Sequence, residues 1–314
     1  MLLINREQID AILPTLDLEA AVRRGFEAYT AGRAVVPPVG ELVFAEPPGD
    51  VHIKYGYIQG DPYYVIKIAS GFYDNPVRGL PSSDGMMLVF AQETGQPVAT
   101  LLDGGTLTDA RTAAAGALAA RLCGPAHVER IGIIGTGIQA RLQLQALATV
   151  TPCRSVSVWG RTPARVSAYV EEMTAAGWRV EAKSREHLVR DCQLIVTTTP
   201  STDPLVMAEW LGPGTHITAV GCDGPHKQEL DAAVFAHADR VIADSLSQCL
   251  ERGDIAHGVR AGHVDPTNIV ELGAVAAGAA RGRVDPAEIS VVDLTGVAVQ
   301  DIYAAVAVLE GVRG

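Results

Sequence analysis

The feature that most constrains the fold is the segment RIGIIGTGIQA, residues 130–140. An apolar strand leads directly into the pattern G-x-G-x-x-A, which is typical of dinucleotide-binding turns. Gly135 allows the tight turn, Gly137 lets the backbone approach a pyrophosphate, and Ala140 keeps the following helix close to the strand. We therefore predict a pyrophosphate site on the helix N-terminus, at a set of five residues: Gly135, Thr136, Gly137, Ile138 and Gln139. The alternative is a tight turn that binds no ligand.

The residues around this turn alternate short apolar strands with helices. Six strands are expected, at Ile131–Ile134, Ser155–Trp159, Arg179–Ala182, Leu194–Thr199, His216–Val220 and Arg240–Ala243. Strands joined by helical connections indicate a parallel, doubly wound sheet with right-handed crossovers. We therefore predict an α/β protein with a Rossmann dinucleotide-binding domain over residues 116–292.

The remaining residues have a different pattern. Thr15 is expected to cap a helix that ends near Gly32, and an Ala-rich helix is expected from Thr108 to Cys123. Period-two runs between these helices predict a largely antiparallel sheet, at Val51–Ile58, Tyr63–Ala69, Met86–Ala91 and Val98–Leu102. The tail from about Asp293 to Leu309 is predicted to be helical and to return to this part of the chain. The result is a smaller, discontinuous α+β domain over residues 1–115 and 293–314.

Charge and cysteine content exclude several classes of protein. Lys and Arg number 25 against 36 Asp and Glu, a net charge of −11, so nucleic acid is not an expected partner. The five cysteines form no CxxC pair and the eight histidines no ligand pattern, so neither a disulfide framework nor a metal site is expected. The first residues carry charges that a signal peptide lacks, and no run of 18 apolar residues predicts a membrane span. We expect a cytoplasmic protein.

The choice between NADP and NAD falls on the end of the second strand of the predicted domain. NAD enzymes place an acidic residue there for the ribose 2′-hydroxyl. This strand ends Trp159-Gly160-Arg161-Thr162, without a carboxylate. Arg161 and Thr162 offer a guanidinium and a hydroxyl, which suit a 2′-phosphate. We predict NADP as the cofactor, with NAD as the alternative.

Two cations before the turn are candidates for substrate binding. Lys67 lies in a strand that is otherwise apolar on both faces, where an unpaired ammonium is costly to bury. Either the strand is an edge strand and the lysine reaches water, or the lysine has a buried partner or a functional role. Arg111 falls in the first turn of the Ala-rich helix. It is either a surface residue, paired for instance with Asp109, or a rigid fork for a substrate carboxylate.

Asp223 is the candidate acid. It follows the predicted strand that ends at Val220, at the sheet edge where doubly wound proteins hold their ligands. Gly221 and Gly224 flank the pair Cys222-Asp223 and allow a ligand to approach closely. The alternative is an Asx turn or a helix cap. No G-x-S-x-G or H-E-x-x-H pattern supports a hydrolase.

Four segments in this order resemble the ornithine cyclodeaminase/mu-crystallin family: TDARTAAAGALAA, GIIGTGIQA, GCDGPHKQEL and DLTGVAVQDIYAA. The resemblance covers nearly the whole chain. It implies a Rossmann domain and a discontinuous domain that forms the substrate pocket and a homodimer interface. It also implies that Lys67 and Arg111 hold the substrate carboxylate and that Asp223 is the catalytic acid or base. It further implies that Thr112 and the strand end Thr197-Thr198-Thr199 line the cofactor and that Gly296 and Val297 close the pocket. Val220, at the end of the next predicted strand, is a further candidate for cofactor binding.

The chain departs from the family pattern at one position. The family has an arginine after the prolines that precede the first sheet strand, whereas this chain has Val39, Gly40 and Glu41 after Pro37 and Pro38. Lys54, in the middle of a predicted strand, is a candidate to supply the missing cation. The alternative is a lysine solvated at the sheet surface.

Three functions remain open on this basis. In the first, NADPH delivers hydride to the C=N bond of a small imino acid, with Asp223 or Lys67 protonating the nitrogen and Lys67 thus also a catalytic candidate. In the second, bound NAD⁺ oxidises a diamino acid, the distal amine attacks the imine, ammonia leaves and hydride returns. In the third, the protein binds NADPH without catalysis. In each enzymatic case the partner is a small amino or imino acid.

Overall fold

The computed structural model describes residues 1–72 and 74–314. The chain forms two compact units, the first comprising Met1–Arg111 with Val297–Gly314 and the second Thr112–Gly296. The chain leaves the first unit within the helix α3 (Thr106–Cys123) and returns to it just before α11 (Ala298–Arg313). These boundaries lie within about four residues of the predicted ones, at 111 in place of 115 and 297 in place of 293.

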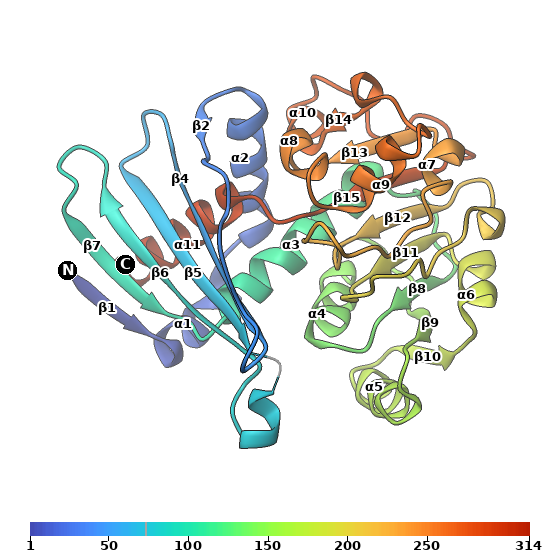
Figure 1. Cartoon of the computed structure of the whole chain (residues 1–314), viewed down its shortest axis with the longest axis horizontal. Helices are drawn as coiled ribbons and strands as arrows, with labels where there is room; N and C mark the ends of the chain where they lie inside the picture. Colours follow the sequence, from blue (N-terminus) through green and yellow to red (C-terminus); the bar gives the residue numbers. More distant parts are fainter. Residues whose placement is uncertain (73) are drawn as a thin grey trace. The chain divides into compact units, whose positions relative to one another are not determined.

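The first unit contains a seven-stranded sheet (Figure 1). The strand order is β1-β7-β6-β5-β4-β2, with β3 also paired to β4. Its strands are β1 (Leu2–Asn5), β2 (Ala34–Val35), β3 (Gly40–Phe44), β4 (Gly49–Ile58), β5 (Tyr63–Phe72), β6 (Ser83–Ala91) and β7 (Pro97–Leu102). The four expected strands are confirmed, and their pairing is antiparallel. Sequence analysis missed β1, β2 and β3, and β1 pairs with β7 in parallel.

Helices pack on one face of this sheet. They are α1 (Arg6–Ile12), α2 (Leu18–Thr30) and α11, with the short 3₁₀ turn η1 (Leu13–Thr15) between α1 and α2. A second 3₁₀ turn, η2 (Asn75–Arg78), lies in the connection between β5 and β6. The helix α11 contacts α2 and strands β4 and β5. Gly25 permits the close approach of α2 to α11, because a Cβ there would lie 2.8 Å from the Val299 carbonyl oxygen.

Two predicted helix starts were wrong. Asp17, not Thr15, caps α2, since its Oδ1 accepts the Ala20 N–H at 2.9 Å, whereas the Thr15 hydroxyl donates to the Ile12 carbonyl. Similarly, α3 begins at Thr106 rather than Thr108. The Asp103 carboxylate accepts the Leu107 N–H at 3.0 Å and fixes this earlier start. Arg111 therefore lies in the second turn of α3.

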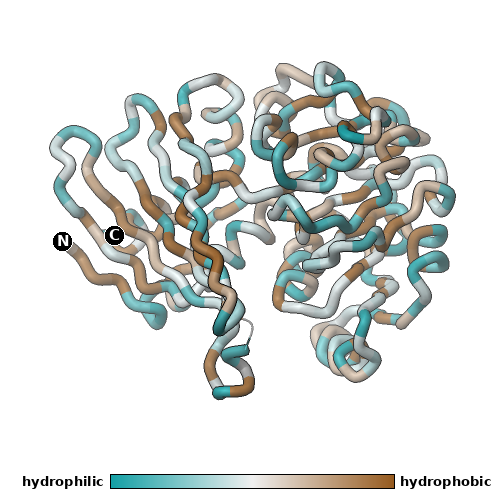
Figure 2. The backbone as a smooth tube through the Cα atoms, in the orientation of Figure 1, coloured by the Kyte–Doolittle hydropathy of each residue, from teal (hydrophilic) through white to brown (hydrophobic). Residues whose placement is uncertain are grey.

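The covered face of the sheet carries one row of residues in register across five strands. Ile4 pairs with Leu101, Leu101 with Met87, Met87 with Lys67, and Lys67 with Lys54. All five side chains are buried. Figure 2 shows the hydrophobic segments of β4 to β7 from which this face is built. The row places two lysines side by side in an otherwise apolar layer.

The second unit contains an eight-stranded, all-parallel sheet in the order β10-β9-β8-β11-β12-β15-β13-β14. Its strands are β8 (Ile131–Ile134), β9 (Ser155–Trp159), β10 (Arg179–Ala182), β11 (Leu194–Thr197), β12 (His216–Ala219), β13 (Arg240–Ala243), β14 (Val270–Glu271) and β15 (Ser290–Asp293). The six expected strands are confirmed, although β11 and β12 end earlier than expected. The doubly wound α/β fold class is confirmed.

The strand β15 is the main feature that sequence analysis missed in this unit. The tail from Asp293 was expected to be helical, but Ser290–Asp293 is a strand between β12 and β13, and the helix begins only at Ala298. The strand has the sequence Ser-Val-Val-Asp, and a run this short with only two apolar residues shows no period that distinguishes a buried strand from the start of a helix.

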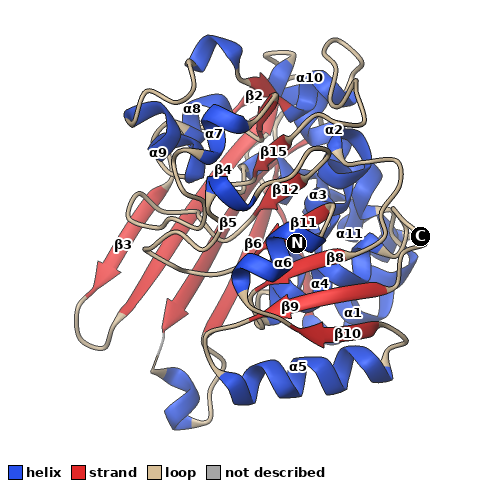
Figure 3. Cartoon of the chain, turned by 90° about the vertical axis from the view of Figure 1, so that its right-hand side faces the viewer, coloured by secondary structure: helices blue, strands red, loops and turns tan. Residues whose placement is uncertain are grey.

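Helices join the strands of this sheet. They are α4 (Ile138–Leu147), α5 (Pro163–Ala175), α6 (Arg185–Asp191), α7 (Val234–His237), α8 (Leu246–Cys249), α9 (Asp254–Arg260) and α10 (Leu272–Ala276), with 3₁₀ turns η3 (Ala208–Trp210) and η4 (Pro266–Asn268). Figure 3 shows α5 along the β9–β10 edge. Among the described helices, none combines the length and apolar content needed to cross a bilayer.

Candidate functional site

The glycine turn connects β8 to α4 in the predicted manner. Gly135 has φ +124°, and a Cβ on it would lie 2.3 Å from the Thr198 hydroxyl, so only glycine fits there. Gly137 is the N-cap of α4 without a side-chain cap, and a Cβ on it would meet no atom within 4 Å. The turn therefore offers unhindered backbone at a helix N-terminus, which fits a dinucleotide pyrophosphate.

Arg141 holds this turn from behind, and sequence analysis missed it. Its Nη1 donates to the carbonyls of Thr136 and Gly137 at 2.6 and 3.0 Å, and its Nε pairs with Glu172 at 2.6 Å. The side chain therefore fixes both carbonyls away from the helix N-terminus. An arginine four residues after the second glycine is the signal in the sequence.

A pocket of about 240 Å³ opens beside this turn at the carboxyl ends of β8, β9 and β11. Seven of the predicted cofactor residues line it: Gly135, Thr136, Gly137, Arg161, Thr162, Thr198 and Thr199. Arg165, in the first turn of α5, lines it as well and was not predicted. The pocket thus combines a helix N-terminus with two exposed guanidinium groups, Arg161 and Arg165.

Five other predicted cofactor residues, the buried Thr197 among them, do not line this pocket. Ile138 and Gln139 begin α4, and the Gln139 Oε1 accepts from Gln143 Nε2 at 3.3 Å. The Thr112 carbonyl accepts from the same Gln143 Nε2 at 3.0 Å, and Val220 is buried just after β12. Their predicted contact with a cofactor stays a prediction.

The first unit contains a buried cluster of cations around Asp301 of α11. The Lys67 Nζ lies 2.9 Å from both oxygens of Asp301. The Arg111 Nε donates to Asp301 Oδ1 at 2.8 Å, and its Nη1 donates to Gln300 Oε1 at 2.6 Å. Each of these side chains is at most 5% exposed. We call Lys54, Lys67, Arg111 and Asp301 the cation cluster.

This geometry excludes the alternatives for the three cations. Lys67 is not on an edge strand, because β5 lies between β4 and β6, and its ammonium is buried. Arg111 is a buried partner of Asp301, not a surface residue. Lys54 is 8% exposed and lies beside Lys67 on the covered face, so it is not solvated at the sheet surface.

Burial and like charges shift the pKa values within the cluster. Desolvation lowers the pKa of Lys67 to about 7, with further lowering by Arg111 and Lys54 and an opposing effect of Asp301. Burial alone would raise the pKa of Asp301, but Arg111, Lys67 and Lys54 together lower it below its usual range. The carboxylate therefore stays ionised, while the Lys67 ammonium is able to lose its proton near neutral pH.

Sequence analysis missed Asp301 and Gln300, although both lie in the quoted segment DLTGVAVQDIYAA. The available signal was a carboxylate and an amide in the first turn of an otherwise apolar helix. Gly296 and Val297, at the entry to α11, are both within this segment. The Gly296 N–H donates to Asp244 at 2.8 Å, and Val297 is the buried N-cap of the helix.

Asp223 lies in the loop after β12 in the second unit. Its Oδ1 pairs with Lys227 Nζ at 2.5 Å, and 38% of its side chain is exposed. The predicted Asx turn or helix cap is not among the contacts of its carboxylate that the structure describes.

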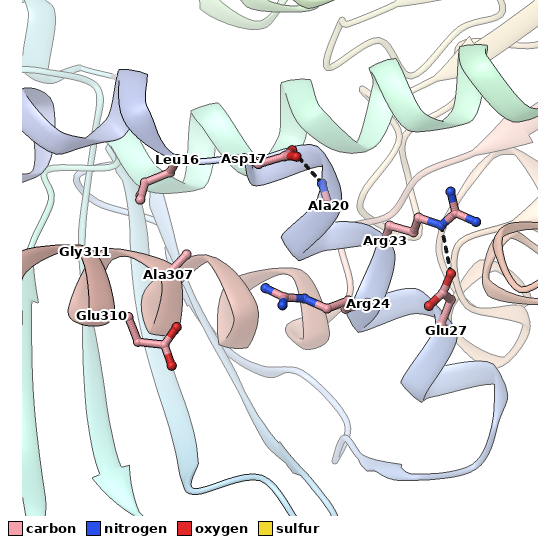
Figure 4. A pocket seen from close by; sticks show the side chains of 9 residues that line it. All are labelled: Leu16, Asp17, Ala20, Arg23, Arg24, Glu27, Ala307, Glu310 and Gly311. Atoms are coloured by element: carbon pink, nitrogen blue, oxygen red, sulfur yellow. Dashed lines mark hydrogen bonds and ion pairs between the residues drawn. The ribbon is translucent and has the colours of Figure 1, made fainter. Parts of the chain in front are cut away.

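The pocket between α2 and α11 is not a candidate site. It has a volume of about 550 Å³, and Arg23, which lines it, pairs with Glu27 (Figure 4). The guanidinium of Arg24, which also lines it, lies over the Tyr303 ring. None of the predicted site residues lines it. Across residues 1–72 and 74–314, no group of His, Cys, Asp or Glu has the arrangement of a metal site, and the five cysteines there are free and buried.

Two relatives of known name align over almost the entire chain. One is the "uncharacterized cyclodeaminase y4tK" of Sinorhizobium fredii, 40% identical over 96% of this chain and 92% of that protein. The other is the alanine dehydrogenase of Archaeoglobus fulgidus, 34% identical over 98% of this chain and 94% of that protein.

Solved structures match equally well. An archaeal alanine dehydrogenase dimer with bound NAD has 32% identity and a TM-score of 0.91, covering 100% of this chain and 96% of that one. The Δ1-pyrroline-2-carboxylate reductase of Thermococcus litoralis, in complex with NADH and L-proline, has 27% identity and a TM-score of 0.92, covering 100% and 98%. The sequence pattern of the ornithine cyclodeaminase/mu-crystallin family matches residues 2–314. This chain belongs to the ornithine cyclodeaminase/mu-crystallin family.

Proposed function

We propose that this protein is a nicotinamide-dependent oxidoreductase that reduces the C=N bond of a small imino acid. The observation that carries the proposal is the cation cluster, in which two buried cations, Lys67 and Arg111, share the carboxylate of Asp301. Cations in excess at a buried position favour an anionic ligand. The carboxylate of an imino-acid substrate is such an anion. Membership of a family that includes imino-acid reductases and cyclodeaminases supports the same assignment.

In this proposal the residues of the first unit bind and orient the substrate carboxylate. Arg111 is held rigidly by Asp301 and Gln300, so its guanidinium is pre-organised for a carboxylate. Lys67 lies beside it, and Lys54 supplies the charge of the arginine that this chain lacks at residues 39–41. Bound nicotinamide supplies the hydride that converts the C=N carbon to an amine carbon, while a proton is added to the nitrogen.

Lys67 is the proposed proton donor. A pKa of about 7 allows its ammonium to give up a proton at neutral pH, which an ordinary lysine does not do. Asp223 is the alternative donor, since it lies at the carboxyl edge of the sheet that carries the dinucleotide turn.

The competing reaction is a cyclodeaminase reaction, favoured by the relative from Sinorhizobium fredii that carries that name. A substrate panel separates the two. We expect oxidation of NADPH or NADH in the presence of pyrroline-2-carboxylate or of an α-keto acid with an amine. Ornithine and related diamino acids should release no ammonia. Ammonia release without reductase activity would instead assign the cyclodeaminase reaction, and tight cofactor binding without either activity a binding protein.

Exchanging Lys67 tests the proton donor. The rate of imine reduction by the wild type should fall as the pH rises through about 7, because only the ammonium form of Lys67 donates. Lys67→Arg keeps the positive charge but does not titrate, so it should retain substrate binding, lose this limb of the pH profile and lower kcat about 100-fold. Lys183→Met, in the second unit, serves as the control. A limb near pH 7 that persists in Lys67→Arg would contradict the assignment of the proton to Lys67.

We propose NADP(H) as the preferred cofactor. Arg161 follows β9 at the position that discriminates the 2′-substituent, and Arg165 lines the same pocket. Two guanidinium groups and the Thr162 hydroxyl suit a 2′-phosphate. The residues lining this pocket include no carboxylate that could accept hydrogen bonds from a ribose 2′-hydroxyl. The two solved relatives described above hold NAD or NADH, so this preference would distinguish the present chain from them.

Binding measurements test the cofactor preference. The wild type should have a lower Kd for NADPH than for NADH. Arg161→Ala should raise the Kd for NADPH about tenfold, because a charge-assisted contact is lost, and leave that for NADH almost unchanged. Arg190→Ala, which removes an exposed arginine of α6, should affect neither. Tighter binding of NADH by the wild type would contradict the proposal.

We also propose that the protein is a homodimer joined through the uncovered face of the first unit's sheet. This face has a second row in register, Tyr55 with Ile66, Ile66 with Leu88. Tyr64 stacks on Phe90 with ring centroids 4.8 Å apart, and Tyr57 and Met86 are each 37% exposed. A broad apolar face of this kind marks an interface. The dimeric state of the archaeal relative supports a second copy as its occupant.

The mass in solution tests this interface. Sedimentation equilibrium should give the mass of two chains for the wild type. Tyr55→Glu should produce single chains, because dimerisation would bury the new carboxylate in an apolar contact. Val284→Glu places the same charge at an exposed apolar residue of the second unit and should remain dimeric. Dimers that survive in Tyr55→Glu, or a wild type of single chains, would disprove the proposed interface.

A further inference from the structure

Glu229 is a completely buried carboxylate that accepts four hydrogen bonds. Its Oε1 accepts from the Thr199 N–H at 2.5 Å and from the Thr199 hydroxyl at 2.8 Å. Its Oε2 accepts from the Thr197 hydroxyl at 2.7 Å and from the Gly221 N–H at 2.8 Å. No part of Glu229 is exposed to solvent. One side chain therefore joins the end of β11 to the loop after β12.

The two backbone segments that Glu229 joins are in very close contact. A Cβ on Gly221 would lie 2.2 Å from the Thr199 carbonyl oxygen, 2.4 Å from the Thr199 nitrogen and 2.7 Å from Glu229 Oε2. Only glycine is compatible with this spacing. The carboxylate of Glu229 thus sets the distance between the backbone at Thr199 and the backbone at Gly221, which already lie too close together for any added side-chain atom.

Glu229 is itself held in place by other residues. The backbone N–H groups of Glu229 and Leu230 both donate to Asp254 Oδ1 at 2.8 Å. Its carbonyl accepts from the N–H groups of Leu205 and Val206. Burial raises the pKa values of Glu229 and Asp254, and the donors around Glu229 oppose this effect by stabilising its ionised form. So many partners around one buried side chain fix its position.

The place of these loops in the fold indicates their purpose. The strand order reverses direction between β8 and β11, which is where a doubly wound sheet binds a dinucleotide. Arg161 and the adenosine side lie toward β9, so the nicotinamide side lies toward β11 and β12. Thr199, which lines the pocket, is the residue that Glu229 holds by both its backbone and its hydroxyl.

We propose that Glu229 is a positioning residue for the nicotinamide half of the cofactor. It touches neither cofactor nor substrate and acts by fixing Thr199 and Gly221 at the sheet edge. The adenosine half, held by the glycine turn and Arg161, does not depend on it. This inference rests on the proposed cofactor binding and goes beyond it, because it assigns the two halves of the cofactor site to separate supports.

Glu229→Gln tests the role. An amide has one acceptor oxygen, so its NH₂ group must face an N–H of Thr199 or Gly221 and the two loops must separate. For whichever of NADPH or NADH the wild type binds more tightly, the Kd should rise about tenfold, with a fall in kcat. The Kd for the adenosine fragment, adenosine 2′,5′-bisphosphate or ADP respectively, should change less than about twofold. Glu209→Gln, an exposed residue of η3, is the matched control.

Thr197→Val is the second variant, in case Glu229→Gln does not fold. It removes one of the four bonds at nearly constant volume, and Thr197 is buried and does not line the pocket. The Kd for the whole cofactor should rise about threefold, with the fragment unaffected. Equal weakening of cofactor and fragment, or no change in either, would overturn the positioning role. If the wild type binds neither the fragment nor the whole cofactor, the proposed function is overturned as well.

Discussion

The ion pairs of Asp301 are the interaction on which the first unit and its site both depend. They join α11 to β5 and to α3, across 234 and 190 residues of sequence. Removing one member of a buried pair typically costs about 3–5 kcal/mol, because the other charge is left without compensation. The return of the chain to the first unit therefore brings the carboxylate that pairs with Lys67 and Arg111, and a C-terminal helix without an acidic residue at position 301 would leave both cations without it.

The fold could be predicted where local patterns suffice. The strand-turn-helix segment around Gly135 contains its own glycine, cap and packing residues, so the second unit was recognised from it. Strand β15 was not, because this short segment with only two apolar residues becomes a strand only through its pairing with β12 and β13 on either side. The cap of α2 failed for a similar reason, since Thr15 and Asp17 are both good caps and the backbone chose between them.

The candidate site shows the same division. Lys67 and Arg111 could be singled out because a charge in an apolar strand or an Ala-rich helix is conspicuous in the sequence. Asp301 and Glu229 could not be assigned a role, because each is defined by partners that only the fold brings near. Asp301 meets Lys67 through the register of β5 under α11, and Glu229 meets Thr199 through the pairing of β11 with β12.

Buried charges of this kind are poor contributors to stability. Replacing a buried ion pair by apolar residues of similar volume is often neutral or stabilising by about 1–4 kcal/mol, so packing alone does not account for the cation cluster. A lysine whose pKa is lowered to about 7 is likewise a cost to the folded state when it is protonated. Both costs have a physical explanation if an anionic ligand completes the cluster. The same reasoning separates Glu229, whose carboxylate already accepts from four donors, from Lys67 and Arg111, two buried cations that share the one carboxylate of Asp301.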